Sequence, residues 1–105
     1  MPQVLYIEWN APAPDVAGEL RRGLQDRLEG SRGVHASFCL QDGPRLAVFM
    51  VVDSPGMLDA YGRWCRLRME RLAGVRPSRH ETFELLGAVE GAAGLAAVLH
   101  GRRAA

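Results

Sequence analysis

The sequence predicts one α+β domain in which the elements follow the order strand–helix–strand–strand–helix–strand. Apolar residues alternate with a period of two in four segments, as in half-buried strands, and recur at helical spacing in two longer segments. The predicted strands span 3–10, 34–40, 45–52 and 80–86, and the predicted helices span about 15–29 and 55–73. This order predicts a four-stranded antiparallel sheet with both helices on one face.

The first predicted strand is followed by residues that cannot extend a sheet. Pro12 and Pro14 both lack the backbone donor that a strand ladder needs. We expect Asp15 to cap the next helix, because its carboxylate can accept bonds from free amide groups there. The apolar residues of this helix fall four positions apart, which is typical of a core-facing stripe. They are Val16, Leu20, Leu24 and Leu28.

The second half of the domain begins with a hairpin. Its turn residues, Gln-Asp-Gly-Pro at 41–44, join the second and third strands. The segment 46–52 is apolar on both faces, which predicts a central strand. We expect Ser54 to cap the second helix, with Pro55 at its first position and Gly74 at its end. The predicted core stripe is Leu58, Tyr61, Cys65, Met69 and Leu72, widened by Trp64 and Leu67.

Two parts of unequal size are predicted along the chain. Residues 1–87 form the α+β domain, and residues 88–105 form a C-terminal helix and tail. The helix is expected within 88–100, which is rich in Ala and Gly. Because glycine weakens a short helix, this segment would have to dock on another surface to be stable.

Composition excludes several classes of protein. All 13 basic residues are arginines, yet the net charge is only +1, so no overall field draws the chain to nucleic acid or a membrane. No run of 18 apolar residues predicts a transmembrane helix, and no signal peptide precedes the first strand, so we expect a cytoplasmic protein. Cys39 and Cys65 lack zinc-ligand spacing and are predicted to be buried thiols.

The apolar third strand has a consequence for assembly. Two helices can cover only one face of the sheet, and the other face then exposes apolar residues of 46–52. Exposed apolar faces usually mark interfaces. Two such sheets packed face to face would form a two-fold homodimer.

On this pattern the chain resembles the ferredoxin-like dimeric α+β barrel superfamily over about residues 3–87. The matching segments are the opening strand 4–9, the Asp42-Gly43 hairpin into 46–52, the helix that carries Tyr61 and Trp64, and the closing strand 80–85. The superfamily includes antibiotic-biosynthesis monooxygenases working without cofactor, polyketide cyclases, haem-degrading monooxygenases, sugar mutarotases and ligand-sensing domains. The resemblance implies a homodimer with a small-molecule cleft beside the sheet and the helices.

The haem-degrading branch of this superfamily can be tested by residue. It carries an Asn near the end of the first strand, a Trp on the second helix and a His about ten residues beyond that Trp. Asn10 and Trp64 fit this pattern, but position 74 is Gly. His80 lies in the next predicted strand and would have to replace the missing ligand. We therefore expect neither haem nor another cofactor.

The predicted catalytic residues are titratable side chains of the sheet. Glu8 and His35 could move protons in an enolisation, and Tyr6 could donate to a developing oxyanion. His80 or Glu84 would neighbour Glu8 on one face, because the last strand is expected beside the first. Alternatively, these side chains pair with one another or face the seam of the dimer. The last strand has too few ligands in close spacing for a metal site.

A second set of residues is predicted to bind substrate. Tyr61 and Trp64 lie three positions apart on the second helix, where they serve either the core or a planar substrate. Ser37 shares a predicted sheet face with His35. Arg68 belongs to an arginine series that forms either a solvated face or a site for an anionic substrate. No aromatic platform alternates with these arginines, so nucleic acid is not expected.

Together these residues favour an enzyme of secondary metabolism. It would act on a planar polar metabolite by general acid–base chemistry without cofactor, as an oxygenase, isomerase or cyclase. The alternative is a dimeric protein that binds a small molecule or serves a larger enzyme without chemistry of its own. A third reading is a purely structural partner that dimerises through residues 88–100.

Overall fold

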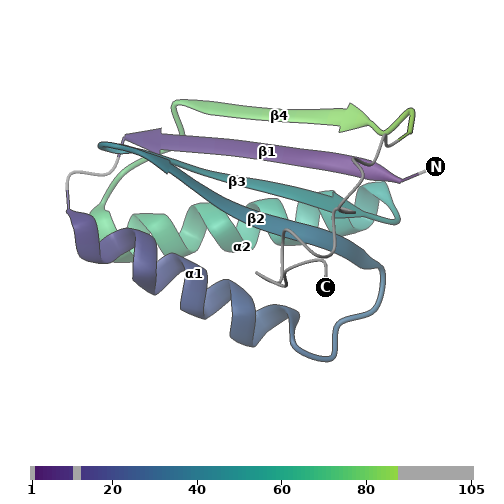
Figure 1. The fold of residues 1–105 in the computed structure, drawn as a ribbon, viewed down its shortest axis with the longest axis horizontal. Coiled ribbons are helices and arrows are strands. Elements are labelled where there is room, and N and C mark those ends of the chain that lie inside the picture. The colour runs from purple at the N-terminus through teal and green to yellow at the C-terminus, as the bar shows by residue number, and fades with distance from the viewer. Residues whose placement is uncertain (1, 11–12, 88–105) are drawn as a thin grey trace, which may run out of the picture.

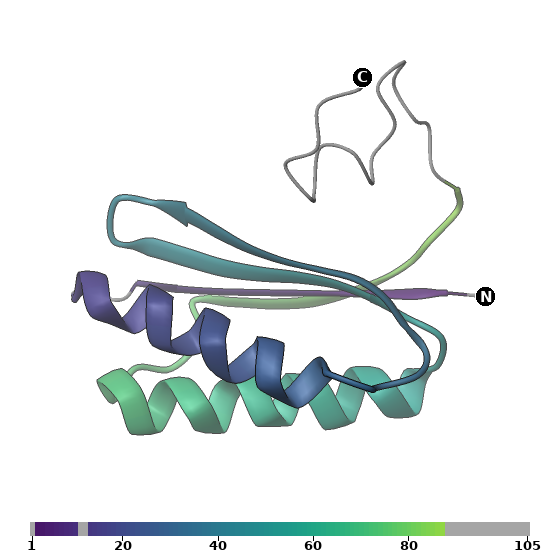
Figure 2. The ribbon, with the colours of Figure 1, turned by 60° about the horizontal axis from the view of Figure 1, so that its bottom comes forward.

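The computed structural model describes residues 2–10 and 13–87. Its elements are β1 (Gln3–Asn10), α1 (Pro14–Leu28), β2 (Val34–Asp42), β3 (Arg45–Val52), α2 (Pro55–Ala73) and β4 (Arg79–Glu84). Both helices lie on one face of the sheet, as Figure 1 and the turned view of Figure 2 show. The predicted ferredoxin-like α+β fold is confirmed. The helix predicted within 88–100 lies outside the described residues.

The sheet has the order β2-β3-β1-β4, and all its strand pairs are antiparallel. Residues directly opposite each other in such pairs project to the same face. Leu5 of β1 pairs with Met50 of β3 and with Thr82 of β4. Tyr6, the next residue, pairs with Phe49 and projects to the other face. The register therefore assigns each strand residue either to the face that the helices cover or to the uncovered face.

The core lies between the covered face and the two helices. Leu5, Ile7 and Trp9 of β1 are fully buried there, together with Leu20 of α1 and Met69 of α2. Burying one such apolar side chain stabilises the fold by about 1.5–3 kcal/mol. The predicted stripes are confirmed apart from one residue: Val16, Leu20, Leu24, Leu58, Cys65 and Met69 are buried, and Leu28, Tyr61, Trp64 and Leu72 pack against them.

The exception in the α2 stripe is Leu67, which is 52% exposed. Its predicted place in the core was wrong. It lies two residues beyond the buried Cys65, a rotation of about 200° around the helix, and so it faces solvent.

The helix ends follow local chemistry, with one correction. In α1 the cap is Ala13 and Pro14 takes the first helical position, so the predicted Asp15 cap was wrong. Asp15 instead lies in the first turn, where its negative charge interacts favourably with the positive end of the helix dipole. In α2 the Ser54 hydroxyl accepts a bond from the Met57 amide, as predicted for a cap.

Two of the glycines with positive φ lie at the end of α2 and in the β2–β3 hairpin. Gly74, with φ of 64°, ends α2 in the left-handed conformation, as predicted. Gly43, with φ of 58°, is the first of two residues between β2 and β3. A two-residue hairpin needs positive φ at that position to match the twist of its strands.

The uncovered face is apolar over β2 and β3. The Phe38 and Phe49 rings meet edge to face, with centroids 5.8 Å apart. Leu40 is 47% exposed and Phe83 of β4 is 50% exposed. No helix covers this face within residues 2–10 and 13–87 (Figure 2). No described helix is long and apolar enough to cross a membrane.

Candidate functional site

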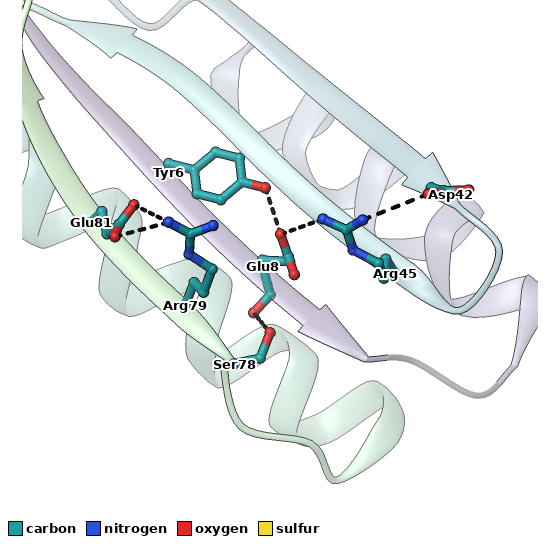
Figure 3. A network of polar contacts seen from close by, with 7 residues as sticks. All are labelled: Tyr6, Glu8, Asp42, Arg45, Ser78, Arg79 and Glu81. Carbon is teal, nitrogen blue, oxygen red and sulfur yellow. Dashed lines mark hydrogen bonds and ion pairs between the residues drawn. The ribbon is translucent and has the colours of Figure 1, made fainter.

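The uncovered face carries a polar network centred on Glu8, near the C-terminal end of β1 (Figure 3). The Tyr6 hydroxyl donates a hydrogen bond of 2.7 Å to Glu8 Oε1. Arg45 Nη2 donates to the same oxygen at 3.2 Å. The pleat of β1 explains the contact between Tyr6 and Glu8, because residues two apart on one strand project to the same face. Glu8 is only 8% exposed.

Hydrogen bonding decides the charge state of this network. The bond from Tyr6, and then the bond from Arg45, lowers the pKa of Glu8, so this carboxyl is ionised at neutral pH. The bond to Glu8 in turn raises the pKa of Tyr6, so its phenol keeps its proton. Glu8 is therefore a charged acceptor that holds two donors in place.

Two further residues complete the network: Arg79, the first residue of β4, and Ser78, directly before it. The Arg79 guanidinium lies 6.0 Å from the Tyr6 ring centroid and pairs with Glu81 at 3.1 Å. The Ser78 amide and hydroxyl both donate to the Glu8 carbonyl, at 2.7 and 3.1 Å. Beside the network is a hollow of about 170 Å³, lined by Tyr6, Glu8, Leu40, Gln41, Asp42, Arg45 and Ala47.

The structure brings together only two of the four predicted catalytic residues, Tyr6 and Glu8. His80 pairs with Ile7 across the β1–β4 ladder and therefore projects to the covered face. Glu84 pairs with Gln3 and does the same. The predicted contact of Glu8 with His80 or Glu84 was wrong, because the register places Arg79 opposite Glu8.

Glu8 does not converge with the polar residues of β2 either. Strand β3 separates β2 from β1. Ser37 and Cys39 pair with Met50 and Val48, which puts them on the covered face. His35 lies at a register shift in β2, and its Nε2 bonds to a carboxylate oxygen of Asp53.

A larger groove lies between α1 and the edge strand β2, on the helix side of the sheet. Its volume is about 730 Å³. Three apolar residues line it, with four polar ones that can orient a ligand: Leu24, Leu28 and Cys39, with Arg21, Gln25, Glu29 and Ser37. We call this the α1–β2 groove. Small-molecule sites typically combine this range of volume with apolar walls and a few polar groups.

The groove has no activated thiol. Burial raises the pKa of Cys39, so its thiol stays neutral. Burial likewise raises the pKa of Cys65 to about 12. Neutral thiols are poor nucleophiles and poor metal ligands. Across the described part of the chain, no group of three His, Cys, Asp or Glu side chains could hold a metal ion.

The four predicted substrate-binding residues do not share one site. Ser37 lines the α1–β2 groove. Trp64 and Arg68 line a different hollow, on α2. Tyr61 lines neither, and its hydroxyl lies 2.5 Å from Ser31 Oγ.

Several lining residues were missed from the sequence. Arg21 and Gln25 are four positions apart on α1, on either side of the buried Leu24. That spacing was a usable signal, because such residues share one helix face. Which strand this face meets depends on how α1 lies on the sheet. Arg45 was missed because its meeting with Glu8 depends on the β1–β3 register.

Comparison with known proteins shows the fold. No protein-family model matches the chain, and no curated protein matches it. A candidate antibiotic biosynthesis monooxygenase of Chloroflexus aurantiacus J-10-fl has a TM-score of 0.64 and 16% identity, over 85% of this chain and 97% of that one. A second such candidate, from Deinococcus radiodurans, has a TM-score of 0.58 and 14% identity, over 84% and 96% of the two chains.

A protein of unknown function from Nitrosomonas europaea is also similar, with a TM-score of 0.59 and 23% identity, over 87% of this chain and 95% of that one. These proteins match the chain across nearly their whole lengths. The chain therefore has the ferredoxin-like fold of structures that include antibiotic-biosynthesis-monooxygenase-like proteins, as the sequence predicted.

Proposed function

We propose that this chain is a small-molecule enzyme of the antibiotic-biosynthesis-monooxygenase type, which acts on a planar polar metabolite by general acid–base chemistry. The observation that carries the proposal is the α1–β2 groove of about 730 Å³, with its apolar and polar lining. The names of two structural neighbours support the class of enzyme. The reaction would be an oxygenation, an isomerisation or a cyclisation.

The groove lining suggests how such a ligand would bind. Leu24 and Leu28 offer apolar contact to a planar ring system. The Ser37 hydroxyl and the Gln25 amide can each form hydrogen bonds with ring oxygens. Arg21 supplies a guanidinium for a ligand carboxylate or a developing oxyanion.

Glu29 is the carboxylate of the groove, and we assign it the role of proton acceptor. In an enolisation it would take the proton from an acidic C–H bond. The electron pair of that bond would move onto the neighbouring carbonyl oxygen, which Arg21 would stabilise. This assignment uses one base and one cation from the same groove.

Tyr6 and Glu8 form a second candidate reaction centre, on the uncovered face. The observation in its favour is that a protonated phenol, an ionised carboxylate and the Arg45 guanidinium meet beside one hollow. Because the one phenolic proton of Tyr6 is donated to Glu8, Tyr6 would turn this proton toward a substrate oxygen only by releasing its bond to Glu8, which would then be free to accept a proton from the substrate. His35 and His80 line neither the hollow nor the groove.

We further propose that the protein is a homodimer that buries the uncovered face. Phe38, Phe49 and Phe83 offer an apolar surface there that the described helices do not cover. A second copy of the same face would remove it from water by a two-fold arrangement. The dimer would also close the hollow beside Tyr6.

The test uses 3-hydroxy-2-naphthoate as the probe, with isothermal titration calorimetry for binding and mass spectrometry for conversion. Arg21→Met should weaken binding roughly tenfold or more, because a hydrogen bond to a charged group contributes about 1.5–3 kcal/mol. Ser37→Ala should have a smaller effect. Arg22→Met is the matched control, because Arg22 is exposed and pairs with Glu19 outside the groove.

These measurements distinguish the groove, the Tyr6 centre and a non-catalytic binding protein. Binding that is insensitive to both Arg21→Met and Ser37→Ala would remove the groove as the site. Conversion lost in Glu29→Gln but kept in Tyr6→Phe supports the groove as the reaction centre, and the reverse supports Tyr6. Binding without any conversion would favour the non-catalytic, ligand-binding alternative.

A further inference from the structure

A second hollow, of about 500 Å³, lies on the helix layer. Five residues of α2 line it: Trp64, Leu67, Arg68, Glu70 and Arg71. Positions 64, 67, 68 and 71 fall on one stripe of a helix, three and four residues apart. We call this the α2 hollow. No strand residue lines it, so it does not open into the core beneath the sheet.

Helix α1 contributes a glycine beside this stripe. A Cβ atom at Gly23 would come within 3.1 Å of the Trp64 ring and 3.2 Å of Arg68 Nε. Both distances are tighter than ordinary van der Waals contact. The absence of a side chain at Gly23 therefore allows Trp64 and Arg68 to lie directly against α1.

Arg68 is held in place but incompletely paired. Its guanidinium carbon lies 5.9 Å from the Trp64 ring centroid. Its Nε is buried and has no hydrogen-bond partner among the described residues. Within the same part of the chain, neither Arg68 nor Arg71 forms an ion pair. A buried donor without a partner destabilises the fold, and an acceptor oxygen within reach of it would remove that penalty.

We propose that the α2 hollow binds a planar aromatic carboxylate, at a site separate from the α1–β2 groove. Two guanidiniums three residues apart offer the planar donor geometry that a carboxylate accepts. Trp64 and the half-exposed Leu67 supply apolar contact for the ring. The volume lies within the range of small-molecule pockets. The proposal does not depend on the function assigned to the groove.

The test titrates the full chain with 2-naphthoate and with its neutral analogue 2-naphthamide, by calorimetry. Arg68→Met and Arg71→Met should each weaken naphthoate binding roughly tenfold, the scale of a charge-assisted hydrogen bond. Naphthamide should bind at least about tenfold more weakly than naphthoate for the same reason. Arg63→Met is the matched control, because Arg63 is exposed on the same helix but does not line the hollow.

Arg71→Met and one further variant, Gly23→Ala, keep the test informative if Arg68→Met alters the fold. Arg71 is exposed, so Arg71→Met tests the site even if Arg68→Met disturbs the packing on Trp64. Gly23→Ala should also weaken binding, because its methyl group would crowd Trp64 and Arg68. Circular dichroism and thermal unfolding show that each variant is folded.

The proposal is overturned if naphthoate binds without saturation, or if Arg68→Met and Arg71→Met both keep the affinity of the unaltered chain. It is also overturned if Arg21→Met removes naphthoate binding while the two α2 variants do not, since the ligand then occupies the α1–β2 groove. That last result would leave the proposed function intact, so the two failures are distinguishable.

Discussion

The two faces of the sheet use the same strands for opposite purposes. On the covered face, Leu5 and Ile7 of β1 meet Met50 and Val48 of β3 in a dry core. On the uncovered face, the intervening Tyr6 and its neighbours mix aromatic rings with a charged network. A face that only had to meet water would not need exposed Phe83 and Leu40. The covered face therefore provides stability, and the apolar residues of the uncovered face support the proposal that it is an interface.

The largest expected effect comes from adjacent residues of β3. Met50 is fully buried on the covered face, whereas Phe49 is half-buried on the uncovered face. Met50→Ala should lower the free energy of unfolding by about 2–5 kcal/mol, because the core cannot refill the space. Phe49→Ala should cost clearly less at protein concentrations where the chain is monomeric. Urea denaturation measures both, and equal losses would contradict the division between the faces.

The uncovered face should be more sensitive to charge than to loss of volume. Phe49→Glu places a carboxylate at the centre of the proposed interface, where its desolvation opposes association. We expect a dimer dissociation constant at least roughly a hundredfold higher by sedimentation velocity, the scale of an unpaired charge in an interface. Arg63→Glu, at an exposed position of α2, is the control and should leave association unchanged.

The Glu8 network should make stability depend on pH. Because Tyr6 and Arg45 lower the pKa of folded Glu8, this carboxylate stabilises the fold above the ordinary glutamate pKa. That contribution is lost as the pH falls through the pKa of the folded state. The stability difference between the unaltered chain and Glu8→Gln should therefore be largest at neutral pH and shrink in acid.

Tyr6→Phe sharpens the same comparison. It removes the first of the two bonds that lower the Glu8 pKa. NMR titration of the Glu8 carboxyl should then show a higher pKa than in the unaltered chain. An unchanged pKa would mean that the phenol does not hold this carboxylate in solution.

The smallest expected effect is a difference in labelling between the thiol of β2 and the thiol of α2. Cys65 is fully buried, with a pKa raised to about 12, whereas Cys39 lines the α1–β2 groove and is partly exposed. At pH 8, iodoacetamide should modify Cys39 at least roughly tenfold faster than Cys65, because thiolate fraction and access set the rate. Mass spectrometry of proteolytic peptides follows each cysteine separately, and equal rates would contradict the assigned burial.

The fold could be predicted because its signals are local. The stripe at Val16, Leu20 and Leu24, the Ser54 cap and the Gly74 end are each written within a few residues. Period-2 alternation likewise predicted the strands, and the motif predicted that β4 lies beside β1. The failed Asp15 cap shows the limit of such signals, since the cap lies two positions earlier, at Ala13, with Pro14 at the first helical position.

The candidate site could not be predicted because it depends on long-range register. Placing Arg79 rather than His80 opposite Glu8 exchanges the side chains of β4 between the two faces. No residue near Glu8 in the sequence encodes that choice. Likewise, Arg21 lines the same groove as Ser37 only because α1 lies over the edge strand β2. The local sequence pattern therefore predicts the helices and strands but not which side chains from different elements lie together.

The most direct test of the uncovered face is a native mass spectrum of the gently purified chain. We expect a mass of two 11.5 kDa chains for the unaltered protein and of one chain for Phe49→Glu. A single-chain mass for the unaltered protein across micromolar concentrations would contradict the proposal that this face meets a second copy.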